Sequence, residues 1–178
     1  VNVTQYAASQ FCKWLSAKTG NFYRLPTEAE WEFACRAGND DPYSFGKNAR
    51  KIKEYGWFKK NSNGQIQKVR LKKPNAFGIY DMYGNVAEWV LDSYNPETYI
   101  LWGNNVKNPV MIGKKLYPRV VRGGSFKSNI DELRSAARGF SKEKWKRRDP
   151  QIPKSLWWFT DANNIGFRIL RPKKTPNK

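Results

Sequence analysis

The residue types that are missing from this chain limit the chemistry it can perform. Its 178 residues include no histidine and two cysteines, Cys12 and Cys35. Without an imidazole, Ser-His-Asp and Cys-His mechanisms and histidine-based zinc sites are excluded. Two cysteines cannot complete a zinc site by themselves. We expect both cysteines to be buried free thiols.

Polar residues that could still act together gather after residue 121. Residues 122–128 read RGGSFKS, and Asp131 and Glu132 come shortly afterwards. Ser128 and these two carboxylates could form a polar catalytic site. Three polar residues in one loop are weak evidence for catalysis, so this interpretation is not the favoured one.

The charge of the chain is strongly positive. Lysine and arginine number 33 and aspartate and glutamate 15, which gives a formal net charge of +18. Such a charge can indicate a nucleic acid, an anionic membrane surface or an acidic partner, although a solvated basic surface is the favoured explanation. No recognised nucleic-acid-binding motif is present. No apolar run approaches the roughly 18 residues that a membrane span needs.

Two helices are predicted early in the chain, where they would position the later loops and strands. Thr4 can cap a first amphipathic helix that Gly20 ends. Thr27 and Glu30 form a capping box that opens a second helix, and Gly38 is its predicted end.

The rest of the chain reads as irregular structure with few strands. Glycine, proline, asparagine and aspartate recur every few positions between short aromatic pieces. Such a pattern predicts turns and loops around a buried aromatic core, within one α+β domain. The credible strands are residues 85–90, 119–122 and 166–170.

Short motifs in a fixed order give this chain a family resemblance. They are YRLPTEAEWEFA (23–34), PNAFGIYDMYGNVAEW (74–89), RGGS (122–125), AAR (136–138) and NIGFR (164–168). The set resembles the formylglycine-generating enzyme (sulfatase-modifying factor) family, whose fold is a variant of the C-type lectin fold. The resemblance implies two helices, few strands and much irregular loop. It also implies a domain over residues 1–172 that lacks the family's usual N-terminal portion, followed by a basic tail at 173–178.

In the family's enzymes, two nearby cysteines bind copper(I) and oxidise a cysteine of a sulfatase peptide to formylglycine. Thiolates suit this soft ion. The first cysteine lies three residues after the serine of Arg-Gly-Gly-Ser, where this chain has Ser128, and no second cysteine comes after it. The resemblance therefore implies no bound copper. It also implies two unpaired thiols, because the family's disulfide partners of Cys35 and Cys12 correspond to Ser135 and Ile169.

The resemblance implies a different metal, a structural Ca²⁺, in residues 81–88. The matching positions give the side chains of Asp81 and Glu88 and the backbone carbonyls of Gly84 and Val86. Calcium takes six to eight hard oxygen ligands and tolerates irregular geometry. Without the resemblance, the two carboxylates would be interpreted only as solvated charges.

The family's substrate cleft suggests a further set of residues. The candidates are Arg122, Ser125, Ser128, Arg138 and Trp158. For the arginines a structural role is favoured, as guanidinium groups that hydrogen-bond loop carbonyls. For Trp158 a place in the core is favoured, with a cleft wall as the alternative. Many of the enzymes carry a tryptophan at the position of Ala87, so we expect this cleft to be reshaped.

These departures predict a non-catalytic binding or scaffold module in an extracytoplasmic protein assembly, in the periplasm or at the cell surface. Relatives of this kind include lipoproteins of bacterial gliding and type IX secretion machinery. The expected partner is another protein or the missing N-terminal part, with a peptide or glycan in the cleft. The alternatives are an enzyme of this family with non-copper chemistry and, less favoured, a basic nucleic-acid-binding protein.

Overall fold

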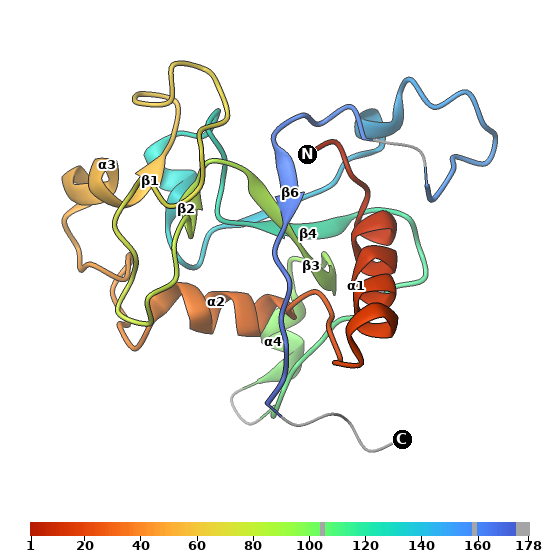
Figure 1. Cartoon of the computed structure of the whole chain (residues 1–178), viewed down its shortest axis with the longest axis horizontal. Helices are drawn as coiled ribbons and strands as arrows, with labels where there is room; N and C mark the ends of the chain where they lie inside the picture. Colours follow the sequence, from red (N-terminus) through yellow and green to blue (C-terminus); the bar gives the residue numbers. More distant parts are fainter. Residues whose placement is uncertain (104–105, 158–159, 174–178) are drawn as a thin grey trace.

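A four-stranded sheet crosses the centre of the molecule (Figure 1). The computed structural model describes residues 1–103, 106–157 and 160–173. The strand order in this part of the chain is β5-β4-β3-β6. The longest strand, β3 (Ala87–Ser93), pairs antiparallel with β4 (Arg119–Arg122) and parallel with β6 (Ile165–Phe167). β5 (Arg138–Phe140) lies at the other edge, antiparallel to β4.

The first helix, α1 (Gln5–Thr19), has the predicted ends. The hydroxyl of Thr4 accepts the N–H of Ala7, which satisfies one of the unpaired donors of the first turn. Gly20 adopts the left-handed conformation and donates its N–H back to the last turn.

The second helix, α2 (Glu28–Arg36), begins with the predicted capping box. Thr27 and Glu30 each accept the other's backbone N–H. Its left-handed cap is Ala37, with a φ of 49°, one residue before the predicted stop at Gly38. The last turn is therefore completed by a residue that sequence preference would not select.

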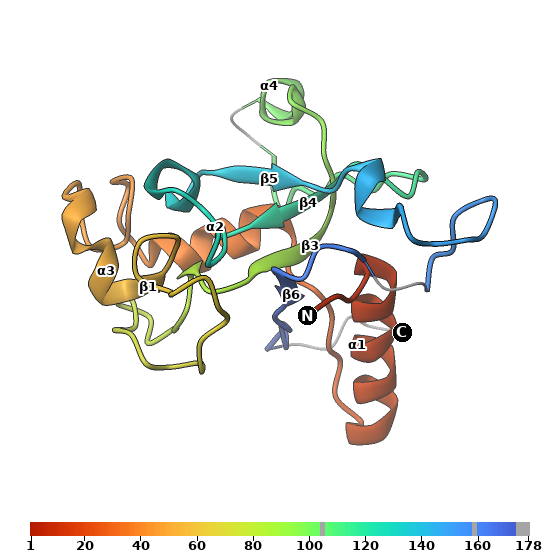
Figure 2. The same ribbon diagram turned by 90° about the horizontal axis from the view of Figure 1, so that it is seen from above.

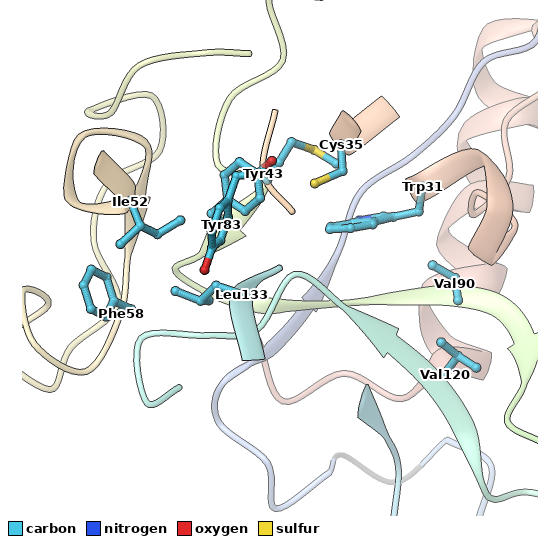
Figure 3. Close-up of a cluster of buried hydrophobic side chains, with 10 residues drawn as sticks. Trp31, Cys35, Tyr43, Ile52, Phe58, Tyr83, Val90, Val120 and Leu133 are labelled. Atoms are coloured by element: carbon cyan, nitrogen blue, oxygen red, sulfur yellow. The ribbon is translucent and has the colours of Figure 1, made fainter. Parts of the chain in front are cut away.

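Both faces of the sheet are buried, each under its own apolar cluster. Trp89 of β3 and Val121 of β4 pack with α1 residues, whereas Val90 and Val120 pack with α2 residues. Since neighbouring residues of a strand point to opposite faces, the two helices cover opposite sides of the sheet. Figure 3 shows the α2 cluster, in which Trp31 and Cys35 lie among side chains from strands, short helices and loops.

The strand predictions are correct in position but incomplete. β4 matches residues 119–122, and β3 and β6 overlap the other two predicted strands with shifted ends. β5 is not predicted, because Gly139 at its centre has a low strand propensity. A Cβ at Gly139 would lie 2.9 Å from a methyl group of Val121, so close strand packing favours glycine there.

The remaining regular pieces are short, as expected for a loop-rich fold. β1 and β2 form a separate parallel pair, and α3 and β1 lie at the end of the molecule away from α1 (Figures 1 and 2). Within the described residues, no helix is long and apolar enough to cross a membrane. The short pieces are η1 (Ala49–Lys51), α3 (Ile52–Tyr55), β1 (Gly56–Trp57), β2 (Tyr83–Gly84), α4 (Thr98–Trp102), η2 (Ile130–Leu133) and η3 (Glu143–Lys146).

Candidate functional site

The Arg-Gly-Gly-Ser segment forms a tight turn at the end of β4. Gly123 and Gly124 have φ values of 87° and 65°, and a Cβ on Gly124 would lie 2.6 Å from the Leu133 side chain. The N–H of Ser125 donates to the Ser128 hydroxyl at 3.1 Å, and the N–H of Ser128 donates to the Ser125 carbonyl at 2.9 Å. The two glycines and the two serines are thus required by the path of the backbone.

Ser125 and Ser128 open onto a surface hollow, which we call the cleft. Arg138 and Ala87 also line it. The lining carries both signs of charge together with aromatic rings. Its other members include Asp131, Glu132, Arg134, Phe140, Lys142 and Trp145.

Neither serine is arranged as an activated nucleophile in the described part of the chain. Ser125 Oγ accepts hydrogen bonds from the Asn164 amide at 3.0 Å and the Lys127 N–H at 3.2 Å. Ser128 Oγ accepts the Ser125 N–H. The hydrogen bonds of the two hydroxyls that the structure describes include none to a carboxylate that could accept the proton. Both side chains therefore serve chiefly to hold the turn.

Arg138 lines the cleft, but its charge is already matched. Its Nε and Nη2 donate to the two carboxylate oxygens of Glu28 at 2.7 and 2.8 Å, and Nη1 donates to the Asn95 carbonyl at 3.0 Å. Tyr94 and Tyr99 lie 4.7 and 5.0 Å from its guanidinium. Capture of an acidic ligand would have to compete with this bidentate pair.

Arg122 does not line the cleft as its candidate role required, and instead has the buried structural role that the sequence favours. Its side chain is fully buried, where it pairs with Glu28 at 3.2 Å, forms a second pair with Glu32, and donates to the carbonyls of Ser135 and Ala136. Both glutamates come from α2, which packs on the opposite side of β4 from the cleft lining at Val121. Trp158, the fifth predicted cleft residue, lies outside the described residues.

Both cysteines are buried and free, as predicted. The Sγ of Cys35 lies 3.6 Å from the Oγ of Ser135, the position that the family resemblance assigns to its disulfide partner. Burial raises the pKa of the Cys35 thiol, against the opposing hydrogen bonds of Ser135 and Tyr83. A raised pKa lowers the thiolate fraction, so neither metal binding nor nucleophilic attack is favoured there.

The four residues of the predicted calcium loop lie together around a second hollow. Asp81, Gly84, Val86 and Glu88 all line it. Asp81 has a φ of 57°, and one of its oxygens accepts the Arg70 N–H at 2.7 Å. The other oxygen, Oδ1, is buried and has no hydrogen-bond partner among the described residues. An unpartnered buried carboxylate oxygen is costly and fits a bound cation.

Glu88 has only part of its capacity left for a metal. Arg168 donates to its Oε2 at 2.5 Å and to its Oε1 at 2.8 Å, and the Trp31 indole donates to Oε2 at 2.7 Å. Since a carboxylate offers about four acceptor positions, one remains on Oε1. The residues present therefore fit a hard, oxygen-ligated cation with Glu88 as a single-oxygen ligand.

Sequence and structure comparisons define the class of protein. Residues 1–151 match the family model for the sulfatase-modifying factor enzyme 1-like domain. The solved structure of PvdO from Pseudomonas aeruginosa superposes with a TM-score of 0.73 at 29% identity, over 96% of this chain and 60% of that one. The chain therefore belongs to the formylglycine-generating enzyme family and has its fold.

Particular relatives place this domain in longer proteins. The chain is 35% identical over 166 residues to a serine/threonine-protein kinase, pkn1, of Chlamydia pneumoniae, covering 93% of this chain and 24% of that protein. It is 31% identical over 183 residues to the formylglycine-generating enzyme of Mus musculus, covering 94% of this chain and 42% of the enzyme. The chain thus spans less than half of either relative.

Sequence patterns did not predict one feature of the site, a buried network of ion pairs. Glu28 and Glu32 of α2 join Arg122 of β4, Arg138 of β5 and the helix residue Arg36. The available signal was two glutamates at i and i+4 on a helix that also buries a tryptophan. Arg36 is one turn away from Glu32, but Arg122 and Arg138 lie about a hundred residues away in sequence, so only the fold reveals them as partners.

Proposed function

We propose that this domain is a non-catalytic member of its family that binds an extended peptide of a protein partner in the cleft. The cleft's polar groups carry the proposal. Its serines hold a backbone turn, and Arg138 is neutralised by Glu28. Among the described lining residues, no thiol is present to bind copper(I).

The remaining lining residues suit a peptide better than a nucleic acid. Asp131 and Glu132 line the cleft together with Arg134 and Lys142, so a uniformly anionic ligand would meet two carboxylates. An extended peptide offers backbone donors and acceptors to both signs of charge, and its side chains can pack on Phe140 and Trp145. A glycan could pack on the same rings, and the crosslinking experiment described below distinguishes it from a peptide.

Bound calcium is part of the proposal, as a structural ion rather than a reagent. Asp81, the carbonyls of Gly84 and Val86, and one oxygen of Glu88 would hold it. Calcium would supply charge compensation for Asp81 and fix the segment that leads into β3. We further propose an extracytoplasmic location, in a periplasmic or cell-surface assembly that could include a lipoprotein.

A site-specific photo-crosslinker tests the peptide-binding role. The crosslinking amino acid replaces Arg134 at the cleft rim or, as a control, Ile100, which is 81% exposed on α4. In lysate of the source organism we expect position 134 to capture a discrete protein and position 100 to capture none. Capture of a glycoconjugate would change the ligand class.

A parallel assay addresses catalysis. The domain is incubated with copper(I), oxygen and a cysteine-containing sulfatase peptide. We expect no oxygen uptake and no formylglycine by mass spectrometry. Copper-dependent oxidation of the peptide would overturn the non-catalytic assignment, even if the crosslinking result stood.

A further inference from the structure

Half of the net charge of the chain lies in one lobe, which we define as residues 47–73. It holds ten lysines and arginines and one acidic residue, Glu54, a net charge of +9 out of +18. Glu54 is itself paired with Lys73 at 2.8 Å. The lobe includes α3 and β1, at the end of the molecule away from α1 (Figures 1 and 2). This end presents a strong excess of positive charge.

Apolar side chains stand exposed among these cations. Ile66, Val69 and Leu71 are 44%, 68% and 60% exposed, in a segment that reads QIQKVRLKK. They alternate with lysine and arginine instead of forming a buried stripe. Exposed aliphatic residues beside clustered cations are the composition of an interfacial membrane anchor.

The loop that carries these residues is braced by the fold. The Gln67 N–H donates to the Asn85 side chain at 3.0 Å, and the Asn85 amide donates back to the Gln67 carbonyl at 3.1 Å. The Arg70 N–H donates to Asp81 at 2.7 Å, and Arg70 itself has a φ of 65°. A non-glycine residue rarely adopts this conformation, so the hydrogen bonds must hold it. The aliphatic tips are therefore presented on a fixed frame.

We propose that residues 65–73 dock onto an anionic lipid bilayer. Ile66, Val69 and Leu71 enter the boundary between headgroups and acyl chains, while exposed lysines of the lobe, Lys53 and Lys68 among them, contact acidic headgroups. The combination matters, because a few aliphatic side chains or a few cations alone give only weak, reversible attachment.

The same surface is poorly suited to single-stranded nucleic acid. Binding of that kind uses free aromatic faces for base stacking. The nearby rings of Trp57 and Tyr80 are covered by Lys72 at 3.7 Å and by Arg70 at 4.9 Å. Exposed aliphatic tips also gain nothing from a phosphate backbone in water.

Vesicle flotation with the full 178-residue chain tests the apolar part of the proposal. The probes are vesicles of phosphatidylcholine alone and of phosphatidylcholine mixed with phosphatidylserine. We expect binding to the mixed vesicles only, and a loss of about tenfold in partition for V69Q/L71Q. The matched control, I100Q/L101Q, replaces side chains that are 81% and 62% exposed on α4 and should bind as the unmodified chain does.

A second pair of variants distinguishes the contribution of the lobe's own lysines from the effect of the net charge of the whole chain. K53Q/K68Q removes two charges from the lobe, and K114Q/K115Q removes two exposed charges elsewhere. We expect about tenfold weaker binding for the first pair and little change for the second, with thermal melts confirming that all variants fold. Equal losses from both pairs, or no flotation at all, would overturn the proposal. The proposal would also be overturned if the chain bound an acidic protein or a nucleic acid and the V69Q/L71Q variant bound it equally well.

Discussion

Ser135 occupies a position where a single atom decides whether the fold is cross-linked. Its hydroxyl lies 3.6 Å from the Cys35 thiol and 3.1 Å from the hydroxyl of Tyr83, which in turn accepts the Ser44 N–H at 2.6 Å. A chain of hydrogen bonds therefore occupies the two positions at which, by the resemblance, some family members form a disulfide. Its members are buried or partly buried, so each polar atom needs its partner.

Restoring the thiol should restore the cross-link. We expect Ser135→Cys to form a disulfide with Cys35 on air oxidation and to stabilise the protein by about 2–4 kcal/mol, because the closed loop is long. Non-reducing mass spectrometry and calorimetry with and without dithiothreitol measure the bond and its effect. Ser135→Ala removes the hydroxyl without adding a thiol and should only destabilise. A protein that keeps two free thiols after oxidation would show that the side chains cannot meet.

Glu28 is the residue on which the buried ion pairs depend. It is fully buried, and its two oxygens receive Arg122 and Arg138 together. Removing one partner of a buried pair leaves an uncompensated charge behind. We expect Glu28→Gln to cost about 3–5 kcal/mol in urea unfolding. The same substitution at Glu54, in an exposed pair with Lys73, should have little effect, and comparable losses would contradict the special role of Glu28.

At the scale of elements, local signals predicted what local contacts determine. The caps of α1 and α2 are set by residues within one turn, so Thr4, Gly20, Thr27 and Glu30 could be identified from sequence alone. β5 depends on pairing with β4 and on the close approach of Gly139 to Val121, which no local pattern encodes.

In the candidate site, too, the features set by local contacts could be predicted and those set by distant contacts could not. The turn of Ser125 and Ser128 is local, and both residues do line the cleft. Arg122 does not line the cleft, because its glutamate partners come from a helix some ninety positions earlier in the sequence. The strand around Gly139 and the buried position of Arg122 thus both depend on non-local packing, which the sequence pattern does not show.

The capping box of α2 gives a pH-dependent prediction. Hydrogen bonds from Arg24 hold the pKa of Glu30 below its usual value, against partial desolvation. A lowered pKa means stability that is present above the unfolded-state pKa, about 4.3, and is lost as the pH falls through the folded-state value. We expect Glu30→Gln, which keeps an acceptor for the cap, to cost up to about 1 kcal/mol at neutral pH and progressively less below about pH 4. Urea unfolding across this range would contradict the assignment if the difference stayed constant.

At the scale of the whole molecule, residues 81–88 connect the central sheet to the basic lobe. They lead into β3, the strand at the centre of the sheet, and through Asp81 and Asn85 they also hold the loop at residues 67–70. The cation site proposed there would thus connect the buried sheet to the basic lobe. A change in residues 81–88 should affect the stability of the fold and the shape of the lobe together.

Calcium should therefore stabilise the molecule as a unit. A ligand that binds only the folded state adds about 2.7 kcal/mol at a hundredfold excess over its Kd, which for a domain of this size raises Tm by roughly 5–10 °C. We expect Asp81→Ala to lose this response to Ca²⁺. Asp81→Asn keeps an oxygen ligand and should respond at higher Ca²⁺ concentration, and Asp40→Asn, a carboxylate elsewhere on the surface, should respond fully. Scanning calorimetry in Ca²⁺ or EGTA measures the shift. If the Tm of the unmodified protein is the same in Ca²⁺ and in EGTA, the unpartnered oxygen of Asp81 does not hold calcium.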